Sequence, residues 1–214
     1  MATNPKPHVT DTIFALSSGA PPAGIGVIRV SGPSARGALE ALTGSVPPPR
    51  RARLMLLTDF RDDAPLDRAL TLWLPGPGRA TGEDLVELHC HGGRAVIAAV
   101  EDALGALPGL RPAQPGGFTR RPFENGRMDL NEVEGLSDLL AAETQQQRRA
   151  ALLMSEGHFS RRIEGWQAAL LNLSAMAEAA LDFSDEDDVP DDAIERRIAL
   201  SLADLADELG EALS

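Results

Sequence analysis

The sequence predicts a mixed α/β domain over residues 1–124, followed by an all-α segment over residues 125–214. The first part alternates short apolar runs typical of strands with Gly/Pro-rich turns, whereas the second part repeats apolar residues every three or four positions. The charges divide at nearly the same place, since residues 129–214 hold 20 of the 32 acidic side chains but only 6 of the 20 Lys and Arg side chains.

Five segments of the first part are predicted to be strands, because each is apolar or β-branched and is bounded by turn residues. A short helix is expected to end at Gly44. A second helix is expected after Gly92 and Gly93, because Ile97 and Val100 begin a series of apolar residues at helical spacing. The predicted strands are residues 12–16, 25–30, 54–58, 70–74 and 85–90.

The second part is predicted to contain three helices separated by short connections. Asp129 is a suitable N-cap for the first helix, which we expect to continue through residues 145–147. An acidic loop over residues 182–192 separates the second helix from the third. The apolar stripe of the third helix is still open at Leu213, so either these helices form an antiparallel bundle or the chain has been cut. The second helix presents Ile163, Trp166, Leu170, Leu173, Ala177 and Leu181, and the third presents Ile194, Ile198, Leu202, Leu205, Leu209 and Leu213.

Composition excludes several classes of protein. The formal net charge is −12, and its concentration in the second part disfavours binding of a nucleic-acid backbone there, so a small anionic ligand is expected in the first part. A single cysteine, Cys90, excludes a disulfide framework and is typical of a reducing compartment, which predicts a cytoplasmic location. No secretory signal or bilayer-spanning apolar run is present, so no membrane association is expected.

The sequence lacks four well-known catalytic or cofactor-binding signatures. The phosphate-loop pattern Gly-x-x-x-x-Gly-Lys-Ser/Thr is absent from the 214 residues, so they cannot bind and hydrolyse GTP through such a loop. A nucleophile elbow, a zinc-protease motif and a dinucleotide-binding motif are also absent. No catalytic residue is therefore assigned.

Residues 81–93 are the most informative stretch. If residues 85–91 are extended, Glu87, His89 and His91 share one face of the strand and the apolar residues between them share the other. This pattern indicates either a polar pocket floor, whose carboxylate accepts two hydrogen bonds from a planar donor edge, or an ordinary half-exposed strand. Two histidines without a third clear ligand do not predict a metal site.

Three arginines lie in the segment of residues 115–130, which is predicted to be a compact loop. The Asn125-Gly126 turn places Arg127 just before a helix, with Arg120 and Arg121 upstream. The loop either recognises an anion or is a solvated linker. Arg29 lies between aliphatic residues of a strand, so it is a solvated outer-face residue, a ligand contact or an interface contact.

Residues 26–32, 81–93 and 115–130 resemble, in order and spacing, the N-terminal region of the tRNA-modifying GTPase family MnmE, also called TrmE. Residues 180–186 are similar to the helical domain that precedes the GTPase domain of that family. The resemblance implies a folate-binding and dimerisation domain over residues 1–124, similar in fold to the folate domains of aminomethyltransferases. It implies the first part of the helical domain over residues 125–214, with the GTPase domain absent.

The resemblance also implies a function. With the flavoprotein MnmG, the family adds an aminomethyl-type group to carbon 5 of the tRNA wobble uridine, using GTP and a one-carbon unit from 5-formyl- or 5,10-methylene-tetrahydrofolate. The family's folate contacts correspond to Arg29, Glu87 and Arg127, the last replacing a usual lysine. GTP, potassium and magnesium belong to the absent GTPase domain. This chain is therefore expected to bind folate and form a homodimer without turning over alone.

Two other interpretations stay open. One is a naturally short, non-enzymatic folate-binding or scaffold paralogue, and the other is a stand-alone folate-dependent aminomethyl transferase. The second of these fits less well, because the helical half resembles MnmE.

Overall fold

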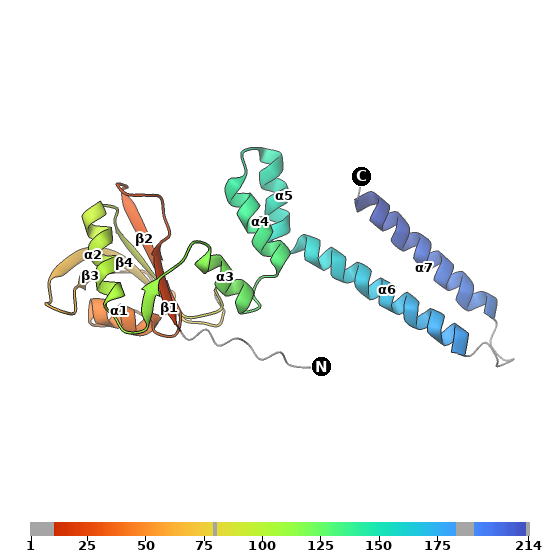
Figure 1. The fold of residues 1–214 in the computed structure, drawn as a ribbon, viewed down its shortest axis with the longest axis horizontal. Coiled ribbons are helices and arrows are strands. Elements are labelled where there is room, and N and C mark those ends of the chain that lie inside the picture. The colour runs from red at the N-terminus through yellow and green to blue at the C-terminus, as the bar shows by residue number, and fades with distance from the viewer. Residues whose placement is uncertain (1–10, 79–80, 183–190, 213–214) are drawn as a thin grey trace. The chain divides into compact units, whose positions relative to one another are not determined.

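The computed structural model describes residues 11–78, 81–182 and 191–212 (Figure 1). The chain divides into two compact units, Met1–Val133 and Glu134–Ser214. The first holds a mixed sheet with helices and the second is helical, which confirms the predicted fold class. Within the described residues, none of the helices combines the length and apolar character needed to cross a lipid bilayer.

The first unit is built on a six-stranded sheet with the order β3-β4-β5-β2-β1-β6, in which only the β1–β6 pair is parallel. All five predicted strands are confirmed, although β4 begins five residues earlier than predicted. The short strand β6 and the helix α3 were not predicted. The elements are β1 (Thr12–Leu16), β2 (Ile25–Ser31), α1 (Ala35–Thr43), β3 (Arg53–Thr58), β4 (Pro65–Leu74), β5 (Leu85–His91), α2 (Arg94–Gly105), β6 (Leu110–Pro112) and α3 (Gly117–Glu124).

The core of this unit lies on one face of the sheet. Alternate residues of β2 and β5, such as Ile28 and Leu88, are fully buried there against Leu39 of α1 and Val100 of α2. Gly44 ends α1, as predicted, and adopts a left-handed conformation. The side chains of the opposite sheet face, which we call the open face, do not belong to this core. The open face carries Ile25, Arg29, Leu54, Leu56, Leu70, Glu87 and His89.

The helical part contains α4 (Leu130–Ala141), α5 (Gln145–Ser155), α6 (His158–Asp182) and α7 (Asp191–Ala212). The prediction of one helix running from Asp129 through residues 145–147 was wrong. Thr144 ends that continuity because its hydroxyl accepts the backbone N–H of Gln147 at 3.1 Å, while Gln147 Oε1 accepts the backbone N–H of Thr144 at 3.0 Å. This capping box starts a new helix. Gly135 of α4 lies against the backbone of α5 and leaves no room for a side chain.

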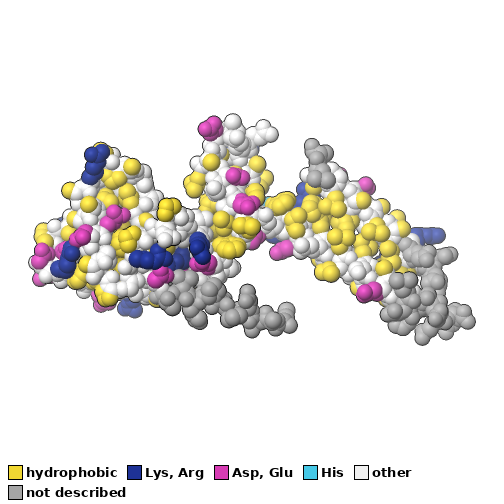
Figure 2. Space-filling view, viewed as in Figure 1, with side chains coloured by type: hydrophobic (Ala, Val, Ile, Leu, Met, Phe, Trp, Pro, Cys, Tyr) yellow, Lys and Arg dark blue, Asp and Glu magenta, His cyan; other side chains and the backbone are white. Residues whose placement is uncertain are grey.

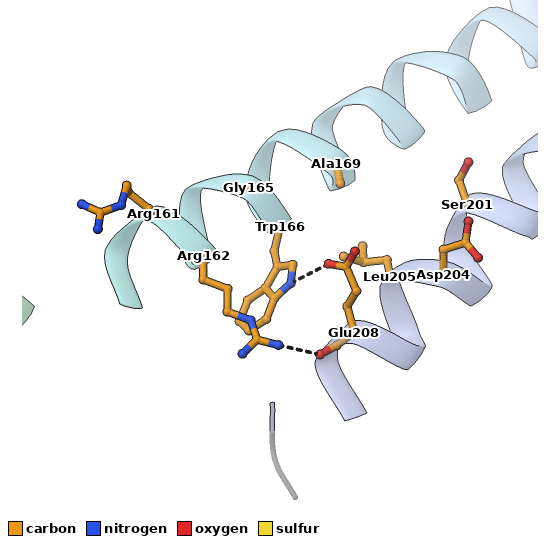
Figure 3. Close-up of a pocket in the computed structure, with 9 residues that line it drawn as sticks. All are labelled: Arg161, Arg162, Gly165, Trp166, Ala169, Ser201, Asp204, Leu205 and Glu208. Carbon is orange, nitrogen blue, oxygen red and sulfur yellow. Dashed lines mark hydrogen bonds between the residues drawn. The ribbon is translucent and has the colours of Figure 1, made fainter. Parts of the chain in front are cut away.

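Helices α6 and α7 form an antiparallel hairpin. Near its open end, Trp166 Nε1 donates to Glu208 Oε2 at 3.2 Å, and the Arg162 guanidinium lies 5.1 Å from the centre of the Trp166 ring (Figure 3). Leu173 and Leu205 are buried as predicted, whereas Leu170 and Leu202 of the predicted stripes are half exposed. Figure 2 shows apolar side chains spread over both helices. Leu213 and most of the predicted acidic loop lie outside the described residues.

Candidate functional site

Strands β2 and β5 form the centre of the candidate site. They pair antiparallel, and their register places Arg29 directly opposite Glu87. The predicted alternation is confirmed, because Ile28 and Leu88 face the core while Arg29, Glu87 and His89 lie on the open face. Two residues that are 58 positions apart in the sequence are therefore neighbours across a strand pair.

The Glu87 carboxylate is held at both of its oxygens. Arg29 Nε donates to Oε1 at 3.0 Å, and His89 Nε2 lies 3.1 Å from Oε2. The Glu87 side chain is 17% exposed, against 46% for Arg29 and 30% for His89. Each carboxylate oxygen accepts more than one hydrogen bond, so this group keeps acceptor capacity for a ligand. The cluster is suited to a planar edge that presents two N–H groups.

Arg127 is placed by the turn before α4, and not by the sheet. Its Nη2 donates to the carbonyl oxygen of Pro77 at 2.6 Å, and its Cγ lies close to Gly82. Among the described contacts, none joins Arg127 to Arg29 or Glu87. The structure thus brings Arg29 and Glu87 into direct contact and gives Arg127 different partners, in the loop that precedes β5.

A buried polar network fixes the loop before β5. The Glu83 carboxylate accepts hydrogen bonds from Ser31 Oγ at 3.1 Å, Arg121 Nη1 at 3.0 Å and Asn125 Nδ2 at 3.1 Å. Asn125 Nδ2 also donates to the Thr81 carbonyl oxygen at 2.7 Å. The network therefore ties this loop to both β2 and the segment that carries Arg127.

The prediction of a compact loop with three arginines was wrong. Arg120 and Arg121 lie in α3, and the Arg121 side chain is only 4% exposed because Glu83 and Asp11 neutralise it. Burial raises the pKa of Asp11, but the hydrogen bond from Arg111 and the charges of Arg121 and Arg111 outweigh it and hold that pKa below its usual value. Arg121 is thus structural, and of the three arginines only Arg127 was predicted to contact the ligand, which stays a prediction.

His91 lies on the same face of β5 as Glu87, as predicted, but it contacts Asp67 and not Glu87. Its Nδ1 lies 2.7 Å from Asp67 Oδ1, and its backbone N–H donates to Asp67 Oδ2 at 2.8 Å. Burial raises the pKa of Asp67, but the hydrogen bonds from His91 and from the Arg68 backbone outweigh it and leave that pKa lowered. No group of three or more His, Cys, Asp or Glu side chains in the described part of the chain is arranged to hold a metal ion.

Cys90 faces the core and is buried. Burial, with the nearby negative charge of Asp67, raises the pKa of its thiol to about 12. The thiol is therefore protonated at physiological pH and is not an activated nucleophile.

A hollow of about 430 Å³ lies on the open face beside the Glu87 cluster. His89 borders both the hollow and the Glu87 carboxylate. The other side chains that line it include Ile25, Leu54, Leu70, Arg68 and His91.

The sequence analysis missed two carboxylates that organise this region. Asp67 was missed because the predicted strand began at residue 70, whereas β4 begins at Pro65 and includes Leu66 and Asp67. Glu83 lies within the stretch that was singled out, just before a strand, but its partners come from distant segments. A charged residue flanking an apolar strand was the only local signal for either.

Comparison with known proteins decides the family. A family model described as the GTP-binding protein TrmE N-terminus matches residues 12–127, and one described as the MnmE helical domain matches residues 130–214. The chain belongs to the MnmE family. Along the sequence, the first family model ends at residue 127 and the second begins at residue 130. The boundary between the compact units falls close by, between Val133 and Glu134.

Several curated MnmE proteins are close relatives. The tRNA modification GTPase MnmE of Novosphingobium aromaticivorans is 67% identical over 181 residues, which cover 85% of this chain and 41% of that protein. The Erythrobacter litoralis MnmE is 62% identical over 94% of this chain and 47% of its own length. The Rhizorhabdus wittichii MnmE is 63% identical over 88% and 43%. The chain thus spans less than half the length of these MnmE relatives.

Proposed function

We propose that this chain binds a tetrahydrofolate derivative, 5-formyl- or 5,10-methylene-tetrahydrofolate, on the open face of its sheet. The observation that supports this most directly is the Glu87 carboxylate, held at both oxygens by Arg29 and His89. A pterin presents a ring N–H and an amino group on one planar edge, and a carboxylate is the natural acceptor for such an edge.

The residues present fit the other end of the ligand as well. Folate ends in carboxylates, and Arg127, which does not contact Glu87, supplies a guanidinium group that binds carboxylates. The bond from Arg29 to Glu87 uses Nε, and no hydrogen bond among the described residues engages its Nη groups. When bound, the folate supplies the one-carbon unit, while Glu87 orients the pterin and an arginine binds the tail or the one-carbon substituent.

The folate proposal is tested by isothermal titration of the chain with 5-formyl-tetrahydrofolate. Glu87→Ala is expected to weaken binding at least tenfold, because a charged hydrogen bond contributes about 1.5–3 kcal/mol. Glu40→Ala, on an exposed position of α1, is the matched control and should bind like the wild type. Unchanged affinity in Glu87→Ala rejects the assignment.

We also propose that two copies pair through the open face. Ile25 is 61% exposed and Leu54 is 62% exposed, and Leu56 and Leu70 expose apolar surface on the same face. Apolar surface gathered on one face is typical of an interaction site.

Sedimentation velocity tests the pairing. Leu54→Glu is expected to shift the chain from dimer to monomer, because it places a charge in the proposed interface. Leu200→Glu is the control, since Leu200 is equally exposed but lies on α7. A monomeric wild type, or a Leu54→Glu variant that stays dimeric, argues against the proposed pairing surface.

We infer that the chain serves cytoplasmic tRNA modification, in which MnmE and the flavoprotein MnmG add an aminomethyl-type group to carbon 5 of the wobble uridine. The support is family membership and the name of the relatives, tRNA modification GTPase. GTP, potassium and magnesium have no assigned residues here, because the 214 residues contain no phosphate loop.

A chimera tests this role. The matching segment of the Novosphingobium protein is replaced by this chain, and wobble-uridine modification is measured by mass spectrometry in cells that lack their own MnmE. The chimera is expected to restore the modification and its Glu87→Ala form to lose it. A stable chimera that leaves tRNA unmodified contradicts the proposal.

A further inference from the structure

His89 occupies a specific place beside the proposed folate contact. It follows Glu87 by two residues on β5, so both side chains leave the same face of the strand. Its Nε2 lies 3.1 Å from Glu87 Oε2, while Arg29 Nε occupies Oε1 at 3.0 Å. The carboxylate is therefore bracketed by two nitrogen groups on opposite oxygens.

The identity of the donor follows from the partner. An ionised carboxylate only accepts hydrogen bonds, so His89 Nε2 carries the hydrogen in this contact. The terminal torsion of a glutamate side chain has a broad energy profile, and a single contact from Arg29 leaves it free to turn. A second donor on the other oxygen fixes the plane of the carboxylate.

We propose that His89 is a positioning residue that orients the Glu87 carboxylate for a planar donor edge. Arg29 and His89 each use one acceptor position, and the remaining lone pairs of both oxygens are left in one plane for the ligand. The inference deepens the proposed folate site and rests on it. His89 acts through Glu87, in the way that a residue behind a binding group sets its orientation.

Two variants separate the donor from the ring. His89→Leu removes the Nε2 donor and keeps a side chain of moderate size. His89→Gln restores an N–H donor, because the glutamine amide nitrogen lies as many bonds from Cα as histidine Nε2 does. His158→Leu is the control, since His158 also lies near a glutamate two residues away, with Nε2 3.7 Å from Glu156 Oε2, but in the helical part.

The experiment measures dissociation constants for 5-formyl-tetrahydrofolate and for 6-methyltetrahydropterin, which lacks the tail. His89→Leu is expected to weaken binding of both ligands by roughly tenfold, because the lost contact acts at the pterin edge. His89→Gln is expected to stay within about threefold of the wild type, and His158→Leu to match it. Melting temperatures of all variants show whether the fold is retained.

The outcomes separate this inference from the folate proposal. Wild-type affinity in His89→Leu overturns the inference, and so does a His89→Gln variant as weak as His89→Leu, because the ring and not the donor would then matter. If Glu87→Ala weakens binding while His89→Leu does not, only the positioning role falls. If the wild type binds neither ligand, the folate proposal fails and the inference fails with it.

Discussion

At the level of single residues, burial decides what Cys90 can do. The thiol lies in the core and its pKa is raised to about 12 by burial and by the charge of Asp67. We expect no reaction of the native chain with Ellman's reagent at pH 8, and one thiol to react after unfolding in guanidinium chloride. Ala20→Cys, on an exposed loop, supplies a control thiol that should react at once. Rapid reaction of native Cys90 contradicts its burial.

The Asp67–His91 pair predicts a pH-dependent contribution to stability. The pKa of Asp67 is lowered from 3.8, so the stabilisation is complete above that pH and is lost as the pH falls through the lower folded-state pKa. Asp67→Asn is expected to lower the free energy of unfolding by about 1 kcal/mol at pH 7, because charged acceptors form stronger hydrogen bonds.

Urea denaturation at several pH values checks this prediction. The difference between the wild type and Asp67→Asn should shrink below about pH 4, once the carboxyl is protonated. Asp138→Asn, at an exposed position of α4, is the control and should show no pH-dependent difference. A constant difference across the whole range would mean that the Asp67 charge contributes nothing.

The sequence predicted which face of a strand each side chain occupies, but it did not predict which distant residues contact one another. The face shared by Glu87 and His89 follows from alternation along one strand, and so does the exposure of Arg29 between two buried residues. That Arg29 and Glu87 touch, or that Arg121 reaches Glu83, depends on register between distant segments. No local pattern contains that information.

At the level of elements, the loop before β5 and the turn before α4 are held together by close packing. Gly82 has a φ of +77°, and a Cβ there would lie 3.0 Å from Asn125 Cβ and 3.1 Å from Arg127 Cγ. Gly82→Ala is expected to lower the free energy of unfolding by about 2–3 kcal/mol, through the left-handed backbone and the crowding together. It should also weaken folate binding, because Arg127 must move.

Gly116→Ala separates the cost of the left-handed backbone from the cost of crowding. Gly116 has a φ of +76° with open space around its Cβ position, so its substitution adds the backbone strain alone, about 1 kcal/mol. Chemical denaturation of both variants gives the comparison. Equal losses of stability in the two variants contradict the tight packing of Gly82 against Arg127.

The break between α4 and α5 was predictable in principle. Thr144 and Gln147 have the Ser/Thr-x-x-Glu/Gln spacing of a capping box, which is visible in the sequence and marks a helix start. The continuous helix was expected because the surrounding residues favour helix everywhere. The helix α3 was harder to predict, since Gly116 precedes it, Gly117 is its first residue and Pro122 lies inside it.

At the level of the whole molecule, the two units differ in how much core they contain. The main apolar cluster lies entirely within Phe14–Leu104, whereas the buried apolar side chains of the described helical unit are Ala151, Leu173 and Leu205. Residues 1–133 expressed alone are therefore expected to unfold cooperatively. Residues 134–214 expressed alone are expected to show helical circular dichroism with a broad, weakly cooperative melt.

Thermal melts followed by circular dichroism and calorimetry test this contrast. The transition of residues 1–133 should stay within a few degrees of the corresponding transition in the full chain. A sharp calorimetric transition in residues 134–214, or an unfolded 1–133 fragment, contradicts the assignment of the main core to the first unit.

The pairing of β2 with β5 also sets when the site comes into existence during folding. The strands join residues 58 positions apart, with α1, β3 and β4 in between. Hairpins such as β1–β2 and β3–β4 close over short loops, whereas this central pairing must overcome a larger loop-closure entropy and is expected to form late. In refolding, binding of a fluorescent folate analogue should then appear with the slowest structural phase, so the ligand would report completion of the sheet.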